Sequence, residues 1–177
     1  PYTPESIKNM KIKMRVPPLM AVKSWADGIG YNSQTIPLSE VEIALKQGMV
    51  DSCSCNDHQQ IWDFRELLKY EYIDKQSFIT MVATINLKLW NSLPKADQDI
   101  LKKASASAIK DIGTRFAQED ILAKIKASGK IQVVEISDAE LRACAEVARG
   151  KVWDDIEKQL LGKEIMDIVR KNASPLP

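Results

Sequence analysis

The chain has 177 residues, a formal net charge of +1, and 28% charged against 45% hydrophobic residues, a balance typical of a globular protein with a substantial core. Near-neutrality argues against nucleic acid or an anionic membrane as a partner, because both need a clustered basic surface. No apolar run approaches the roughly 20 residues of a membrane span. The sequence starts at Pro1 without a Met or an apolar signal core, so we expect it to begin inside a longer protein or after processing.

Residues 11–16 alternate strictly between basic and apolar side chains, which predicts a half-buried strand. The apolar face comprises Ile12, Met14 and Val16, and the basic face comprises Lys11, Lys13 and Arg15. Pro17-Pro18 would end this strand and open a helix that runs to about residue 28, since proline is tolerated in a first helical turn.

The next segments continue the alternation of strand and helix. Residues 34–38 predict a second strand, and Ser39 with Glu42 predicts a capping box at the start of a helix that ends at Gly48. A third strand is expected at 49–55. Strands that alternate with helices predict an α/β fold with parallel connections.

The middle of the chain predicts strands and then a long helix. Residues 66–73 and 77–87 have strand-like content, and the second run is apolar enough for a central buried strand. After a short helix capped by Asn86, a helical pattern runs from Leu93-Pro94 to about residue 128, with Gly113 as a possible bend. Some 35 helical residues span ~50 Å. Because sustained heptads are absent, this length predicts a helix that bridges two lobes.

The last third predicts one strand followed by helices. Residues 131–134 predict a short strand, and Ser137 with Glu140 predicts a second capping box. The helix that it opens would run to about Leu161, and a last short helix would occupy 163–171.

Three cysteines and one histidine are the residues with potential chemistry of their own. Cys53 and Cys55 are too close in an extended segment to bridge comfortably. Either of them could pair with Cys144 in an oxidising compartment, or all three could be buried free thiols. With His58 they form Cys-x-Cys-x-x-His, which is not a standard zinc spacing and lacks an evident fourth ligand.

Four segments resemble the solute-binding proteins of TRAP transporters. They are MKIKMRVPP (10–18), IPLSEVEIALKQGMVDS (36–52), FRELLKYEYI (64–73) and INLKLWNSLPKADQDILKKA (85–104), and their order and spacing agree with the family over nearly the whole chain. The resemblance implies an α/β, periplasmic-binding-protein-like fold of two lobes with a long lobe-spanning helix, of which this chain holds the C-terminal half.

The resemblance also implies a domain division and partners. Residues 1–77 would belong to the second lobe, 78–120 would contribute to the first lobe and start the spanning helix, and 121–177 would return to the second lobe. The implied partners are the N-terminal half of the same protein, a small organic acid and the membrane permease of a TRAP transporter. The implied compartment is periplasmic, and no cofactor is expected.

The family pattern points to individual ligand contacts. Arg15 stands where the family has an arginine that grips the ligand carboxylate, and Leu38 stands where several members have an aromatic pocket residue. Counting without gaps puts Cys55 at the place of a family asparagine that helps to hold the ligand, while a slip of one residue would let Asn56 supply the amide. Leu19, just after Pro17-Pro18, completes the expected ligand contacts.

Two other functions compete with ligand capture. Cys55 or Cys53 could act with His58 as a thiol-dependent enzyme, because the residues lie close together in the sequence. Alternatively, the long helix could mediate a homodimer. The resemblance favours a binding protein that closes by a hinge motion around its ligand and not an enzyme.

Overall fold

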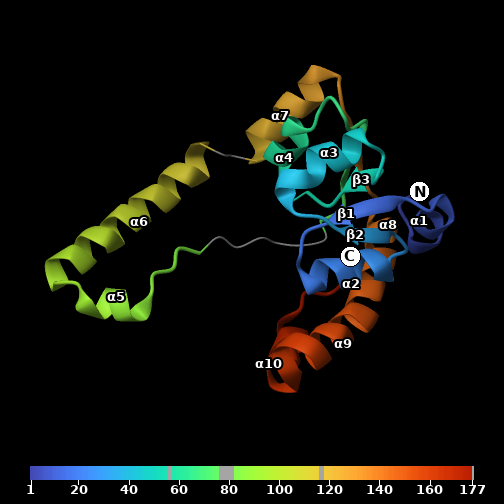
Figure 1. Ribbon diagram of the computed structural model, residues 1–177. Helices are drawn as coiled ribbons and strands as arrows, with labels where there is room; N and C mark the ends of the chain where they lie inside the picture. Colours follow the sequence, from blue (N-terminus) through green and yellow to red (C-terminus); the bar gives the residue numbers. More distant parts are fainter. Residues whose placement is uncertain (56, 76–81, 116–117, 177) are drawn as a thin grey trace.

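The computed structural model describes residues 1–55, 57–75, 82–115 and 118–176. Figure 1 shows a body that contains the strands and most of the helices, and an arm that extends away from it. The arm consists of helices α5 (Leu87–Ser92) and α6 (Lys95–Arg115).

A parallel sheet of three strands forms the first part of the body. Strand β1 (Lys13–Val16) lies in the centre, with β2 (Asn32–Thr35) on one side and β3 (Ser52–Cys53) on the other. Helices α2 (Met20–Gly28) and α3 (Val41–Lys46) make the connections between the strands. The expected parallel α/β arrangement is therefore confirmed.

The apolar face of β1 lies in the main core, as its alternation predicts. Met14 and Val16 are buried there against Trp25 and Ala26 of α2, and Ile7 of α1 (Pro4–Met10) joins them. Arg15, between Met14 and Val16, points to the opposite face. The same alternation that buries the core therefore presents the arginine on the other side of the sheet.

A second parallel sheet pairs β4 (Tyr70–Ile73) with β5 (Gln132–Glu135). Helix α7 (Gln118–Ser128) packs against α4 (His58–Asp63) beside this sheet. A continuous helical course follows, through α8 (Asp138–Val147), a π-helical segment (Ala148–Val152), α9 (Trp153–Ile156) and a second π-helical segment (Glu157–Leu161). Gly162, at φ +74°, breaks this course before α10 (Gly162–Asn172).

The two predicted capping boxes have different outcomes. Ser137 accepts a hydrogen bond from the backbone of Glu140, whose side chain accepts one from the backbone of Ser137, so this box is confirmed. The box at Ser39 is wrong, because Ser39 lies inside a short 3-10 helix (Leu38–Glu40) and α3 begins only at Val41. The extra turn after Pro37 moves the helix start past the serine.

The predicted strand at 77–87 is wrong for the part that the structure describes, and residues 77–81 lie outside the described residues. Residues 82–86 form no strand, and Val82 is 75% exposed. Two helices, α6 and α7, occupy the range of the expected 35-residue helix. Residues 116–117 between them lie outside the described residues, so a single continuous helix stays a prediction, and α6 continues past Gly113. The prediction rested on apolar content alone, and the described part of this segment has no neighbouring strand with which it could pair.

The capping box makes stability depend on pH through Glu140. Its carboxylate accepts hydrogen bonds from the backbone N–H of Ser137 and of Tyr2, and these lower the pKa of Glu140 from 4.5 to about 2. A lowered pKa in the folded state stabilises the protein above the unfolded pKa, and this gain is lost as the pH falls towards 2.

We therefore expect Glu140→Gln to unfold at lower urea concentration than the wild type near neutral pH, with the difference shrinking near pH 3. The control is Glu146→Gln, an exposed carboxylate on the same helix. Equal midpoint losses for Glu140→Gln at both pH values would contradict the assignment.

Candidate ligand site at the carboxyl edge of the sheet

The candidate site lies where the three strands of the first sheet end. Parallel strands bring their carboxyl ends to one edge, which is where ligands bind in open α/β sheets. Arg15 is the last residue but one of β1, Ile36 follows β2, and Ser54 follows β3. The register aligns Arg15 with Gln34 and with Cys53, so the two neighbouring strand ends flank the arginine.

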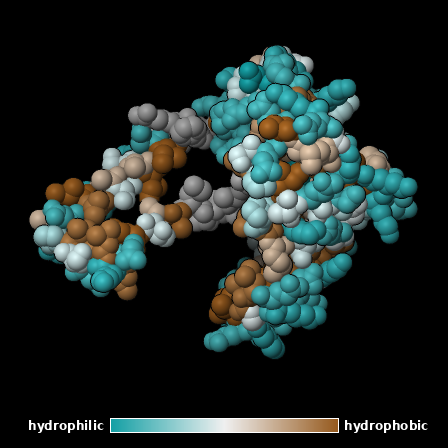
Figure 2. Space-filling model, in the orientation of Figure 1, coloured by the Kyte–Doolittle hydropathy of each residue, from teal (hydrophilic) through white to brown (hydrophobic). Residues whose placement is uncertain are grey.

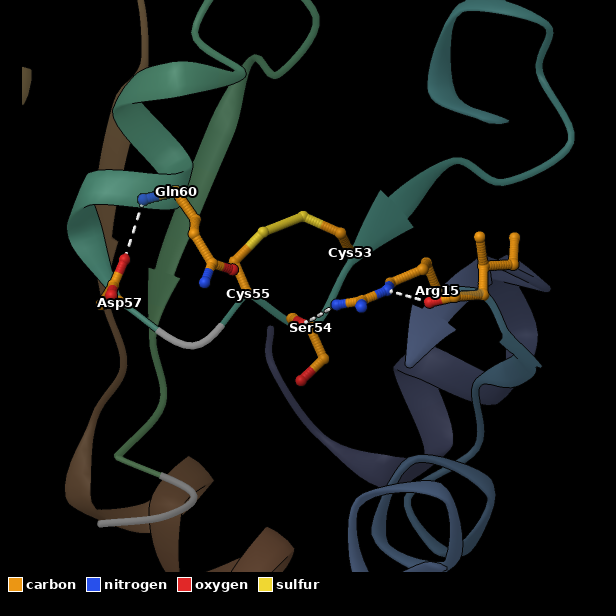
Figure 3. Close-up of a disulfide and its surroundings, with 7 residues drawn as sticks. Arg15, Cys53, Ser54, Cys55, Asp57 and Gln60 are labelled. Atoms are coloured by element: carbon orange, nitrogen blue, oxygen red, sulfur yellow. Dashed lines mark hydrogen bonds between the residues drawn. A yellow bond between two sulfur atoms is a disulfide. The ribbon is translucent and has the colours of Figure 1, made fainter. Parts of the chain in front are cut away.

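Arg15 is held by these two strand ends and is only 2% exposed. Its Nε donates to the carbonyl oxygen of Ile36 at 2.8 Å, and its Nη1 donates to the carbonyl oxygen of Ser54 at 3.1 Å. Figure 3 shows the guanidinium with its hydrogen bond to Ser54. Among the described residues Nη2 has no hydrogen-bond partner, so one edge of the planar group remains available.

The charge of Arg15 has no counter-ion in the part of the chain that the structure describes. Both of its partners are neutral carbonyl groups, and no described carboxylate forms an ion pair with it. Burial lowers the pKa of the guanidinium below its ordinary value. Because a buried charge without an opposite charge is unfavourable, this arrangement favours binding of an anion at the free edge.

Cys53 and Cys55 form a disulfide, which corrects the expectation that they are too close to bridge. Two residues of fully extended chain span roughly 7 Å, whereas the two Cα atoms here are 5.5 Å apart. Strand β3 ends at Cys53, so the chain leaves the extended conformation in time to bring the sulfurs together. Of the two alternatives for Cys144, pairing with Cys53 or Cys55 is wrong and the buried free thiol is confirmed.

The disulfide also removes the basis of the thiol-enzyme hypothesis. Neither Cys53 nor Cys55 carries a free thiol, and Nδ1 of His58 lies 2.6 Å from Oε1 of Glu71. Within the described ranges, no group of three or more histidine, cysteine or acidic residues is placed to hold a metal ion. In the described residues, the Cys-x-Cys-x-x-His motif therefore offers neither a free thiol nor a metal site.

The remaining expected contacts are grouped around the same edge. Leu19 follows β1 and Leu38 follows β2, and both side chains are exposed, while Cys55 follows β3 and is half-buried. Asn56 lies outside the described residues. Sequence reasoning missed Ile36 and Ser54, because they act through backbone carbonyl groups, which every residue type carries.

The comparisons with solved structures define the fold. The chain has the fold of one part of a two-lobed periplasmic solute-binding protein. A TRAP solute-binding protein from Shewanella oneidensis with bound succinate matches with a TM-score of 0.76 and 22% identity, over 94% of this chain and 54% of that one. The ectoine-binding protein of a Halomonas elongata TRAP transporter matches with a TM-score of 0.80 and 22% identity, over 94% and 56%.

The family is shown by its sequence model. Residues 2–159 match the model of bacterial extracellular solute-binding protein, family 7, and the chain belongs to this family. The resemblance seen in the sequence and the predicted two-lobed α/β class are thereby confirmed. Because the family consists of transporter binding proteins, the prediction that the chain is not an enzyme is confirmed as well.

Two curated proteins are similar to this chain in sequence, and one of them is named as a periplasmic binding protein. The C4-dicarboxylate-binding periplasmic protein DctP of Rhodobacter capsulatus is 24% identical over 163 residues, which cover 90% of this chain and 48% of that protein. An uncharacterized Haemophilus influenzae protein is 36% identical over 96 residues, which cover 53% of this chain and 29% of that protein. The chain thus spans at most about half the length of these relatives.

None of the helices in the described part is long and apolar enough to cross a membrane.

The disulfide can be checked by counting thiols. In denatured, unreduced protein from an oxidising compartment, one thiol of the three cysteines should react with a thiol reagent, and all three should react after reduction. A Cys144→Ala variant should show none before reduction. Three reactive thiols without reduction would contradict the bridge.

Proposed function

We propose that this chain is the second-lobe half of the extracytoplasmic solute-binding component of a TRAP-type transporter, and that Arg15 binds a carboxylate of a small organic acid. The observation that carries the proposal is the buried guanidinium, which has no counter-ion among the residues that the structure describes. A bound acid would supply the missing negative charge. The loaded protein would then deliver the acid to the membrane permease.

The geometry of Arg15 suits a carboxylate in particular. A guanidinium is a planar fork whose N–H groups match two carboxylate oxygens. The two carbonyl groups hold Nε and Nη1 and leave Nη2 without a described partner. When a cleft closes and water leaves, the attraction between the charges increases, because the local dielectric constant falls.

The ligands of related proteins support the same chemical class. The Rhodobacter relative is named for C4-dicarboxylates, and the Shewanella structure contains succinate. A TRAP solute-binding protein from Sulfitobacter contains galacturonate, with a TM-score of 0.79 and 23% identity. Succinate is itself a C4-dicarboxylate, and galacturonate shares a carboxylate with it but differs in the rest of the molecule. We therefore propose the carboxylate as the common element and leave the remainder of the ligand open.

The arm supports the proposal that another part of the protein completes the fold. Residues 100–112 of α6 are all exposed, including Ile100, Leu101 and Ile112. Figure 2 shows apolar residues along the arm, and apolar residues of α10 such as Ile168 are exposed as well. Apolar faces of this extent normally mark contacts with other structure.

We propose that the N-terminal half of the same protein covers the arm. Residues 1–77 and 121–177 would form one lobe, and 78–120 would belong partly to the other. Helix α7, which follows the arm in the sequence, packs on α4 of the body, and this supports the proposal that the chain returns to the same lobe after the arm. The alternative is that a second copy of the chain covers α6 in a homodimer, and this stays a prediction.

The compartment follows from the same set of observations. The matched family is described as extracellular. A disulfide such as Cys53–Cys55 persists in oxidising compartments, of which the periplasm is one. We therefore propose a periplasmic location for the complete protein.

The role of Arg15 can be tested by substitution in the complete protein. A screen of small carboxylates by thermal shift identifies an acid that stabilises the wild type, and calorimetry gives its Kd. Arg15→Ala should weaken binding by about 2–5 kcal/mol, roughly thirty-fold to several-thousand-fold, because it removes one partner of a buried charge pair. Arg15→Lys should also bind weakly, since an ammonium group cannot form the planar fork.

Lys13→Ala is the matched control, because Lys13 lies on the same face of β1 but pairs with Gly48 and Asp51. We expect its Kd to stay close to that of the wild type. Unchanged affinity in both Arg15 variants would mean that the acid binds elsewhere.

If the N-terminal half covers the arm, a charged residue placed on the covered face of α6 should lower the free energy of unfolding. In the complete protein Ile112→Asp should lower the free energy of unfolding by more than about 2 kcal/mol, because it would bury an unpaired carboxylate. Lys103→Asp, on the opposite side of α6, should change it by less than about 0.5 kcal/mol. Denaturant unfolding measures both.

Light scattering on the same samples separates the two candidate occupants. A monomeric complete protein with a sensitive Ile112 fits cover by the N-terminal half, whereas a dimer that Ile112→Asp dissociates fits the homodimer. Equal, small effects of the two substitutions would contradict a covered face.

A further inference from the structure

The disulfide lies directly beside the proposed ligand-binding arginine. Ser54, the single residue between Cys53 and Cys55, is buried. Its N–H donates to the carbonyl oxygen of Arg15 at 2.8 Å, and its own carbonyl oxygen accepts from Nη1 of Arg15 at 3.1 Å. The N–H and the carbonyl group of Ser54 are therefore both bonded to the same arginine, and Figure 3 shows the bond from the guanidinium.

The far end of this loop is anchored as well. Oδ1 of Asp57 accepts a hydrogen bond from the backbone of Gln60 at 2.8 Å and caps α4. His58 contacts Glu71 of β4 at 2.6 Å, and its backbone N–H donates to Gln118 of α7 at 2.9 Å. The bridge thus lies between two fixed points, the end of β3 and the capped start of α4.

We propose that the Cys53–Cys55 disulfide is a positioning element of the ligand site. It restricts the backbone of Ser54, so that the Ser54 carbonyl group keeps Nη1 of Arg15 in place and the Nη2 edge stays directed to the ligand. This inference rests on the proposed binding role of Arg15. It assigns to the two cysteines a role in ligand affinity. They would play this role through their bond to each other and not as free thiols or metal ligands.

The small size of the loop separates this role from ordinary stabilisation. A disulfide stabilises a fold mainly by restricting the unfolded chain, and the effect grows with the number of residues enclosed. This bridge encloses a single residue, so its removal should change the melting temperature little. Loss of the restraint on Ser54 should instead appear in the behaviour of Arg15.

The first test needs no ligand. In the complete protein, the Nε–H signal of Arg15 is assigned in a nitrogen–proton NMR spectrum by its disappearance in Arg15→Lys. A Cys53→Ser/Cys55→Ser double variant should shift this signal and accelerate its exchange with water several-fold. The control Cys144→Ala keeps the disulfide and should leave the signal unchanged.

The second test measures affinity for the acid that the thermal-shift screen identifies. The double variant should bind it about ten-fold or more weakly, the scale of one hydrogen bond to a charged group, with the melting temperature of the free protein changed by only a few degrees. Wild-type protein reduced with a phosphine and alkylated should behave like the double variant, which covers the case in which the variant fails to fold.

The outcomes separate the two proposals. If no acid binds the oxidised wild type, the proposed function fails, while the Arg15 signal still decides the positioning role. If the acid binds with equal Kd with and without the bridge and the Arg15 signal is unchanged, the positioning role is overturned although the proposed function stands.

Discussion

The guanidinium of Arg15 lies out of water between the carbonyl oxygens of Ile36 and Ser54, with no described carboxylate paired to it. Moving such a charge away from water is unfavourable, and two neutral carbonyl groups compensate for it only in part. The fold tolerates this because Met14 and Val16 on either side secure the strand in the core. The proposed site is therefore held in place by packing that does not depend on a ligand.

The parallel sheet determines what surrounds this charge. Because the strand order is β2-β1-β3, both neighbours of β1 end beside Arg15 and present backbone carbonyl groups to it. The connections after these strand ends bring Leu19, Leu38 and Cys55 to the same edge. The disulfide and the cap at Asp57 then fix the connection that carries Ser54. Topology therefore gathers the candidate contacts from segments some 40 residues apart in the sequence.

Much of this arrangement could be predicted from local patterns, and the failures have identifiable causes. The alternation in 11–16 placed Met14 and Arg15 on opposite faces correctly, since a strand has only two faces. The cap at Ser137 is predictable because its helix begins directly after the serine. The 3-10 turn at Ser39 is not predictable, because the residue types there fit the start of an α-helix equally well. The bridge between Cys53 and Cys55 depends on where β3 ends, and the residue types do not show this. The strand predicted at 77–87 fails at Val82, which has no neighbouring strand among the described residues. The carbonyl partners of Arg15 leave no signature in sequence at all.

The most direct measurement is a crystal structure of the complete protein with the organic acid that co-purifies with it, identified by mass spectrometry. The account predicts that a carboxylate of this acid lies within hydrogen-bonding distance of Nη2 of Arg15, while Nε and Nη1 keep their bonds to Ile36 and Ser54. A ligand whose acidic group is bound by other residues, with Arg15 still lacking a negative partner, would contradict it.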